Sequence, residues 1–543
     1  MKLLSTKLLL FLNLLLLGQS TFAIGIKNKL NVALSVFDDL VNTYSDNRIP
    51  PKLELLSYSS SPATLVADYT NTSSPVIRMS ERAYDICVGM GKDSLNALAV
   101  ILSHELAHHY KGHLNPGGYA FSNAKSSNPS KTQLLQIEME ADETGAFYAY
   151  LAGYNVFSVQ EKLIDKIYSV YKLPEKVKGY PTKNERKKAS LQKQKELKEL
   201  IPVFEAGETL FALKKYAEAA DCFVFIINRF PSREMYYNAG IAKFMQAVLL
   251  FDGKELPFAY PLELEAKSRL ATDRGMVNHA VAPTGSIQER NKLLAEAQAF
   301  LLKAREISPG YTNATIGLAC LYDVQDNHYK AIGEINDLLK LSKQNNADAY
   351  VVRGIAYARN GQLNEAKADL QTAVSNNGLY AKPNYDLLKQ YAQQGWTEWI
   401  WESLTTFWSG WFEAGTPAPP PVLLNPNNEF INSNNPATLP NSSIKQLSVG
   451  NWQLKLVSEN ASWMVTPNFE LKTVATPPFF TGATYAGVKI GQFANTIQNL
   501  YGQPTEIVPT TMGNVYVYTN CRILFVFDNA GKLRKWILYK MEQ

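Results

Sequence analysis

The sequence predicts a multidomain chain in which a mainly α-helical domain is followed by an α-solenoid of paired helices and a small α+β domain. The length of 543 residues exceeds the usual size of one domain. Glycines recur at spacings of 33 and 37 residues in the middle of the chain, and alternating apolar residues dominate its last part. Together these features suggest a division into residues 1–23, 24–200, 201–395, 396–440 and 441–543.

The composition sets limits on the class of protein. Hydrophobic residues make up 46% of the sequence, which excludes a wholly disordered protein. The 54 Lys and Arg stand against 49 Asp and Glu, so the charge gives no bias toward nucleic acid, and we expect no nucleic-acid partner.

Residues 1–23 have the pattern of a secretory signal peptide. Lys2 and Lys7 precede a leucine-rich core over residues 8–17, and Ala23 ends a stretch that suits cleavage. An uncleaved anchor helix is the alternative. We therefore expect an exported protein, in the periplasm or else outside the cell. The four cysteines are far apart in the sequence, which favours isolated buried thiols over disulfides: Cys87, Cys222, Cys320 and Cys521.

A histidine-rich helix carries the chemistry of the first domain. Four of the six histidines lie within residues 104–113, and His104-Glu105-x-x-His108 is a zinc-binding pattern. An apolar stretch predicts that this helix begins near Asp93 or Ser94. His104 and His108 are one helical turn apart, so both can bind one Zn²⁺, whereas Glu105 is placed to act on water.

A catalytic zinc needs a third protein ligand. His113 lies five residues after His108, His109 faces another direction, and Glu140 is a further alternative. Glu138 is favoured, since residues 136–145 are expected to be helical and Glu138 and Asp142 share one face of that helix.

The two motifs together resemble the signature of the zinc endopeptidases that include HtpX, the prenyl-protein endopeptidases and BepA. The resemblance covers residues 60–190. It implies a mainly α zincin domain of the gluzincin type, with one Zn²⁺ on His104, His108 and Glu138. It also implies catalytic roles for Glu105 and Asp142, in which Asp142 orients a ligand histidine.

One part of the family pattern is changed in this sequence. The family has His-Pro followed by an arginine, whereas this sequence has Tyr180, Pro181 and Arg186. We expect the Tyr180 hydroxyl to donate to an oxyanion and Arg186 to brace the carboxylates of the site. Residues 114–130 are a candidate lid, and a strand expected over residues 74–80 is a candidate edge for pairing with substrate.

The middle of the chain is similar to tetratricopeptide repeats (TPRs), whose unit is 34 residues. Gly207, Gly240, Gly317 and Gly354 mark the first helix of each pair, where close crossing leaves room only for a small residue. Residues 251–289 interrupt the second pair as an insertion. Stacked pairs form a groove, which we expect to hold a protein or peptide; a scaffold is the alternative.

Residues 396–440 combine five tryptophans with a Pro- and Asn-rich linker. The tryptophans are expected to cap the last repeat or to contact a membrane surface peripherally. In the last part, strands are expected over 452–457, 515–518, 523–527 and 533–539 and a helix over 491–501.

Two functions follow from this organisation. The first is an exported zinc endopeptidase that cleaves protein or peptide substrates presented by the repeats, in quality control of envelope proteins, as the BepA-like order of domains implies. The alternative is a repeat-based chaperone or assembly factor whose zinc site is latent or structural.

Overall fold

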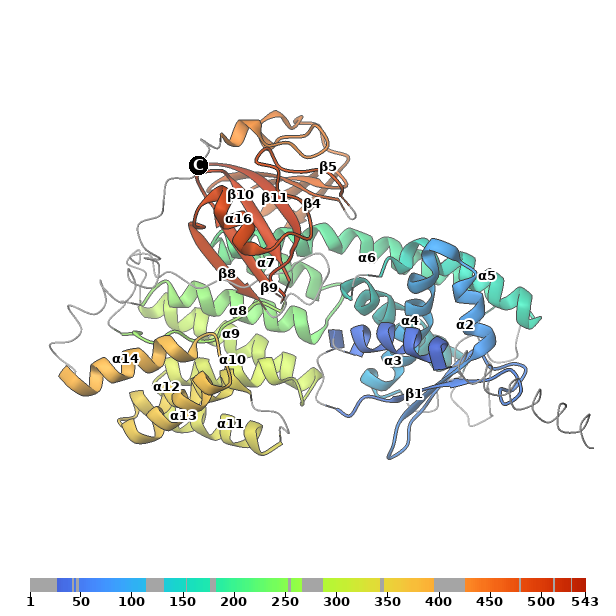
Figure 1. Cartoon of the computed structure of the whole chain (residues 1–543), viewed down its shortest axis with the longest axis horizontal. Coiled ribbons are helices and arrows are strands. Elements are labelled where there is room, and N and C mark those ends of the chain that lie inside the picture. Colours follow the sequence, from blue (N-terminus) through green and yellow to red (C-terminus); the bar gives the residue numbers. More distant parts are fainter. Residues whose placement is uncertain are drawn as a thin grey trace, which may run out of the picture. The chain divides into compact units, whose positions relative to one another are not determined.

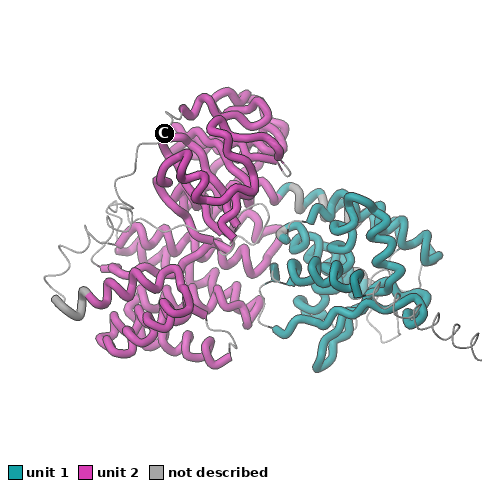
Figure 2. The backbone as a smooth tube through the Cα atoms, viewed as in Figure 1, with its two compact units in different colours: residues 1–199 teal, residues 200–543 magenta. Residues whose placement is uncertain are grey.

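The structure, a computed structural model, divides into two compact units, residues 1–199 and 200–543 (Figure 2). It describes residues 27–41, 43–44, 48–113, 131–152, 154–175, 182–251, 255–265, 287–341, 346–394, 425–477, 480–510, 513–528 and 530–543. The expected signal peptide, the candidate lid over residues 114–130 and the five tryptophans of residues 396–411 lie outside these ranges.

Unit 1 combines a three-stranded sheet with helices (Figure 1). A helix over residues 27–41 comes first. The other elements of this unit are β1 (Lys52–Leu56), β2 (Ala67–Thr70), β3 (Val76–Ser80), α2 (Glu81–Val88), α3 (Ser94–Lys111), α4 (Lys131–Leu151), α5 (Gln160–Tyr171) and the first part of α6 (Lys183–Ala212), with short 3₁₀ turns at Gly91–Asp93 and Val156–Ser158.

The strand order β1-β3-β2 corrects one expectation. β3 pairs in parallel with β1 and antiparallel with β2, so it is the central strand. Its backbone groups are used within the sheet on both sides. The expectation that this strand is a free edge for pairing with substrate is therefore wrong.

Unit 2 begins with antiparallel helix pairs that stack one on the next. They are the end of α6 with α7 (Tyr216–Ile227), α8 (Arg233–Val248) with α9 (Ile287–Ile307), α10 (Thr312–Val324) with α11 (His328–Leu341), and α12 (Ala347–Arg359) with α13 (Leu363–Ser375), followed by α14 (Ala381–Gln394). A Cβ on Gly240 would lie 2.9 Å from Leu301 of α9, and one on Gly354 would lie 2.8 Å from Leu370 of α13. Gly207, Gly240 and Gly354 therefore stand where paired helices cross closely, which confirms the predicted helix-pair repeat. Gly317 of α10 instead faces Leu301 of α9, in the preceding pair, so the expectation is wrong for this glycine.

The C-terminal part of unit 2 is an antiparallel sheet with the order β4-β5-β6-β7-β11-β10-β9-β8. Its strands are β4 (Lys445–Val449), β5 (Trp452–Ser458), β6 (Ala461–Val465), β7 (Glu470–Ala475), β8 (Glu506–Thr510), β9 (Gly513–Tyr518), β10 (Ile523–Phe527) and β11 (Leu533–Glu542). Helix α16 (Ala494–Tyr501) packs on one face, where Trp536 and Leu538 are buried. This confirms the predicted α+β character.

Residues 425–440, expected as the end of a linker, belong to this C-terminal core. They contain two short 3₁₀ turns, Pro426–Asn428 and Pro436–Thr438. Ile431 and Leu439 are buried with the sheet, and Glu429 accepts a hydrogen bond of 2.6 Å from the Tyr501 hydroxyl. The apolar residues among the many asparagines therefore decide the packing of this segment.

The opposite face of the sheet contacts the first repeat. Lys535 lies 3.2 Å from Glu205 of α6, and the Trp452 indole donates to Asp221 of α7 at 3.2 Å. A cavity of about 30 Å³ at this contact is lined by Glu208, Leu264 and apolar side chains of the sheet. The repeats and the sheet are thus held together by partly buried polar contacts as well as apolar ones.

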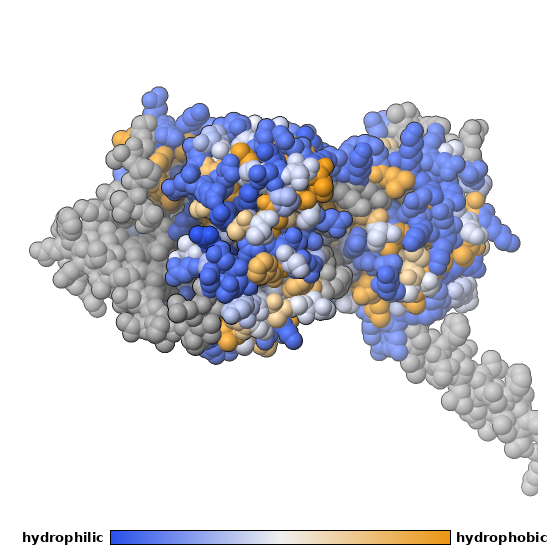
Figure 3. Space-filling view, turned by 90° about the horizontal axis from the view of Figure 1, so that it is seen from above, coloured by the Kyte–Doolittle hydropathy of each residue, from blue (hydrophilic) through white to orange (hydrophobic). Residues whose placement is uncertain are grey.

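The face drawn in Figure 3 is mainly hydrophilic over the described residues, with several smaller hydrophobic areas. Among the helices that the structure describes, none combines the length and the apolar character that a membrane span requires. All four cysteines are buried and free, which confirms that expectation.

Candidate metal centre

Helix α3 places the histidines inside unit 1. Side chains from Ala97 to Tyr110 are buried without interruption, because the helix packs between the sheet, α2 and α4. The helix begins at Ser94, as the sequence predicts. His104, Glu105 and His108 are at most 1% exposed.

Helix α4 lies against α3 at the level of His104. A Cβ on Gly145 would lie 2.8 Å from the carbonyl carbon and oxygen of Ser103 and 2.9 Å from the backbone nitrogen of His104. Only glycine allows this approach, which brings the two backbones into contact. Asp142 and Glu138 lie one and two turns before Gly145, so the same contact carries their carboxylates to the histidines.

Three donor groups converge between these helices. The Nε2 atoms of His104 and His108 are 3.1 Å apart. Glu138 places Oε2 3.3 Å from His104 Nε2 and Oε1 3.8 Å from His108 Nε2. The ligand atoms of this trio all lie within 4.8 Å of one another, which makes it a candidate metal site.

A carboxylate orients the first histidine. His104 Nδ1 lies 2.7 Å from Asp142 Oδ1, so Nδ1–H donates to this carboxylate and Nε2 is directed at Glu138 and His108. Burial alone would lower the pKa of His104, but Asp142 and then Glu138 outweigh it and raise this pKa to about 10. The centre therefore has strongly negative character.

His113 orients the second histidine. Gly112 adopts φ 68°, and its N–H and that of His113 donate to the backbone oxygens of His109 and His108. This left-handed helix end folds the backbone back, and His113 Nδ1 comes to lie 2.8 Å from His108 Nδ1. When His108 Nε2 is unprotonated, Nδ1–H donates to His113, whose Nε2 lies 3.5 Å from Glu140 Oε2.

The other candidate ligands lie elsewhere. His109 Nδ1 is 3.1 Å from the hydroxyl of Tyr69, and Glu140 pairs with Lys111 at 2.9 Å and with His113. The hydrogen bonds from His113 and then from Lys111 lower the pKa of Glu140 to about 2. Among the described residues, the group that could hold a metal ion therefore consists of His104, His108 and Glu138, without His109, His113 or Glu140.

The remaining predicted residues are placed only in part. Glu105 is fully buried on α3, next to His104. Tyr180 lies outside the described residues. Arg186 belongs to α6, where its backbone alone is described. Their predicted roles stay predictions.

The donor set fits a zinc ion. Ligands at about 2.0–2.1 Å from a tetrahedral Zn²⁺ lie about 3.3 Å from one another. The separations of 3.1, 3.3 and 3.8 Å bracket this value. Two imidazoles and one carboxylate are one of the ligand sets found at catalytic zinc sites, which keep their fourth position open.

No protein-family model and no curated protein matches the sequence. Among solved structures, it is similar to a thermophilic TPR protein of Thermus thermophilus, at 13% identity and a TM-score of 0.26, over 43% of this chain and 91% of that one. It is also similar to a TPR protein of Parabacteroides merdae, at 14% identity and a TM-score of 0.21, over 47% and 93%. Both neighbours are repeat proteins, but these TM-scores carry no argument, so the repeat assignment rests on the helix pairs.

Proposed function

We propose that the protein is a zinc-dependent endopeptidase that acts on exported proteins. One Zn²⁺ would be held by His104, His108 and Glu138. The observation that carries the proposal is the convergence of two imidazole Nε2 atoms and one carboxylate, all buried, within 4.8 Å. Each histidine has a partner at Nδ1 that directs Nε2 to the same point.

The protein's own residues supply the acid–base chemistry. Bound Zn²⁺ would act as a Lewis acid toward the scissile carbonyl and lower the pKa of water. Glu105, adjacent to His104 on α3, accepts the proton of the attacking water and passes it to the leaving amine. Asp142 holds His104 in the tautomer that leaves Nε2 available, and His113 does the same for His108.

The signal-like start of the sequence supports an exported location, and the repeats supply a surface for protein substrates. Quality control of envelope proteins in the periplasm is the function that combines these parts. Tyr180 would donate to the oxyanion of the substrate in place of the family's histidine.

A chaperone or assembly factor with a latent site is the second candidate. The near-complete burial of all three donors favours it, since a substrate carbonyl must reach the same point. Against a structural site stands the number of donors: the trio found among the described residues is one short of the four that structural zinc usually has.

The test uses the full-length protein and casein as an unfolded substrate. Wild type should hold one zinc per protein molecule and cleave casein until a chelator removes the metal. Glu105→Gln should keep the zinc and lose about 10²–10⁴ in rate. Glu161→Gln, the same change at a half-exposed carboxylate of α5, should leave zinc and rate unaltered.

Bound zinc without cleavage in the wild type would favour the latent site. Cleavage by Glu105→Gln at the wild-type rate would refute the mechanism.

A further inference from the structure

The insertion between α8 and α9 occupies the inner face of the repeats. Residues 255–265 form neither helix nor strand, apart from one bridge residue. At its first residue, Glu255 pairs with Arg290 of α9 at 2.7 Å. The polar contacts of residues 259–265 in the repeats come from α8, α10, α12 and α14, and from residues at the ends of these helices. Helices α8, α10 and α12 are the first helices of successive pairs, and α14 follows the last pair. The segment therefore crosses the side of the repeats that these helices form, which is the inner repeat face.

Two buried asparagines bind the backbone of the segment. Asn384 of α14 accepts from the N–H of Ala259 at 2.9 Å and donates to its carbonyl at 2.8 Å. Asn238 of α8 does the same with Glu265, at 2.8 and 2.9 Å. A side-chain amide that pairs with both groups of one residue imitates a neighbouring β-strand, and it can hold an extended peptide of any sequence.

Apolar side chains fix the register of the segment. Leu256, Phe258 and Leu264 are at most 2% exposed, and Phe258 packs within the core of α12, α13 and α14. Pro257 and Pro261 restrict the backbone to extended conformations, which reduces the entropy lost on binding.

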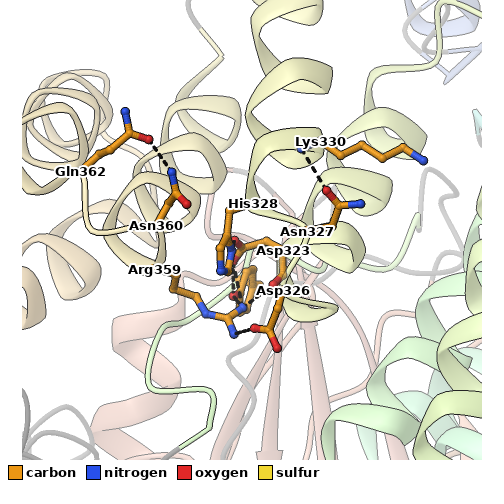
Figure 4. A network of polar contacts seen from close by, with 9 residues as sticks. Asp323, Asp326, Asn327, His328, Lys330, Arg359, Asn360 and Gln362 are labelled. Atoms are coloured by element: carbon orange, nitrogen blue, oxygen red, sulfur yellow. Dashed lines mark hydrogen bonds and ion pairs between the residues drawn. The ribbon is translucent and has the colours of Figure 1, made fainter.

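The buried carboxylate of Asp323 receives the segment's tyrosine. Figure 4 shows Asp323 together with His328 and Arg359. The Tyr260 hydroxyl donates to Asp323 Oδ2 at 2.5 Å, and His328 Nδ1 lies 2.6 Å from Asp323 Oδ1. Arg359 of α12 donates to the same hydroxyl at 3.2 Å and pairs with Asp326 at 2.7 Å. Burial and Asp323 raise the pKa of Tyr260, so the hydroxyl keeps its proton and remains a donor.

The far end of the segment is held by its acidic residue. Glu265 Oε2 accepts from the Tyr311 hydroxyl at 2.7 Å and from Asn313 at 2.9 Å, both at the start of α10. Next to it, Leu264 forms a bridge with Thr510 at the end of β8, the edge strand of the C-terminal sheet. The segment therefore runs from α14, at Ala259, to α8 and the start of α10, at Glu265, and ends beside this edge.

We propose that residues 255–265 are an intramolecular ligand of the inner repeat face, which a protein partner binds by displacing them with an extended segment of the same chemistry. The partner segment carries a buried aromatic residue, a tyrosine two residues later and an acidic residue five residues after that. Emptying this face would remove the hydrogen bonds that the segment makes to the buried amides of Asn238 and Asn384, at about 1–3 kcal/mol for each buried group left unsatisfied. An occupied face, by its own segment or by a partner's, is therefore favoured over an empty one. This inference does not depend on the metal centre, which lies in unit 1.

The test measures binding of a fluorescent peptide with the sequence of residues 255–265 to the full-length protein. In a released variant, a Gly/Ser sequence of equal length replaces residues 255–265. The peptide should bind the released variant at least tenfold more tightly than the wild type, because its own segment no longer competes. Adding Asn384→Ala should weaken that binding about tenfold, whereas adding Asn376→Ala, at the end of α13, should not.

A second measurement keeps the test decisive if the released variant fails to fold. In the wild type, hydrogen exchange at the amides of Ala259 and Glu265 is followed with an excess of isotopically heavy peptide. The proposal predicts that both amides exchange at least tenfold faster as the peptide takes their place. A folded released variant that does not bind the peptide overturns the proposal. Hydrogen exchange of the Ala259 and Glu265 amides that stays as slow at saturating peptide as without it also overturns the proposal.

Discussion

Replacing Gly145 by alanine tests how α3 and α4 assemble the centre. The new Cβ would lie 2.8 Å from the backbone of Ser103, whereas ordinary contacts begin at 3.4 Å. The two helices must therefore separate by about 0.6 Å, because backbone atoms cannot rotate aside. Glu138 and Asp142 move with α4, and the 2.7 Å contact between Asp142 and His104 lengthens to about 3.3 Å, where a hydrogen bond is weak.

Two effects of Gly145→Ala follow from this displacement. Overpacking of a buried contact should reduce the free energy of unfolding of unit 1 by about 1–3 kcal/mol. Disturbing the partner of a ligand histidine should weaken zinc binding about 10–100-fold. Urea unfolding without zinc measures the first effect, and competition with a chromophoric chelator measures the second.

Gly333→Ala is the matched control. Gly333 lies within α11, and a Cβ there meets nothing within 4 Å. This change should stabilise unit 2 by up to about 1 kcal/mol and leave zinc affinity unchanged. A Gly145→Ala protein with the wild-type urea midpoint and zinc affinity would refute the argument for close helix packing.

Three further predictions follow from the same contacts. His113→Ala removes the partner of His108 Nδ1 and should weaken zinc binding about 10–100-fold without unfolding the protein; an unchanged affinity in the chelator competition would contradict the orienting role. Zinc binding at pH 7.5 should release about one proton from His104, whose pKa is raised to about 10, so affinity should rise with pH up to that value. Calorimetry in buffers of different ionisation enthalpy checks this, and binding without proton release would be inconsistent with it. Burial raises the pKa of Glu208, so the folded state binds a proton that the unfolded state releases, and stability should fall as pH rises above about 4.5. Glu208→Gln should reduce this fall in urea midpoints between pH 5 and 8, and an equal slope in both proteins would count against it.

The sequence predicts those parts of the site that depend on helical periodicity. His104 and His108, like Glu138 and Asp142, are four residues apart, and each spacing predicts a shared helix face without further information. The structure indeed brings these four side chains together. Gly145 is the last residue of the motif over residues 136–145, but only the structure shows that it contacts the backbone of α3.

The sequence presents His113 only as a candidate ligand, because spacing alone does not show how a helix ends. The signal that could have revealed its role is Gly112: a glycine after a buried helix predicts a left-handed turn, which returns the next residue toward His108. The same turn explains why His113 contacts the Nδ1 side of the His108 ring, whereas the other donors face Nε2.

Pairings between distant residues could not be predicted from local patterns. β3 is central only because β1 and β2 flank it, and the order of strands in a sheet is not encoded in one strand's sequence. The insertion is recognisable by its length, but its path depends on Asn238 and Asn384, which bind it from helices far apart in the sequence.

The most direct test of the central claim is the zinc K-edge absorption spectrum of the full-length protein loaded with one equivalent of Zn²⁺. The account predicts four nitrogen or oxygen neighbours at about 2.0–2.1 Å, with the scattering of two imidazoles that His104→Ala reduces to one. A shell of sulfur at about 2.3 Å, or a spectrum that His104→Ala leaves unchanged, would show that the metal binds elsewhere.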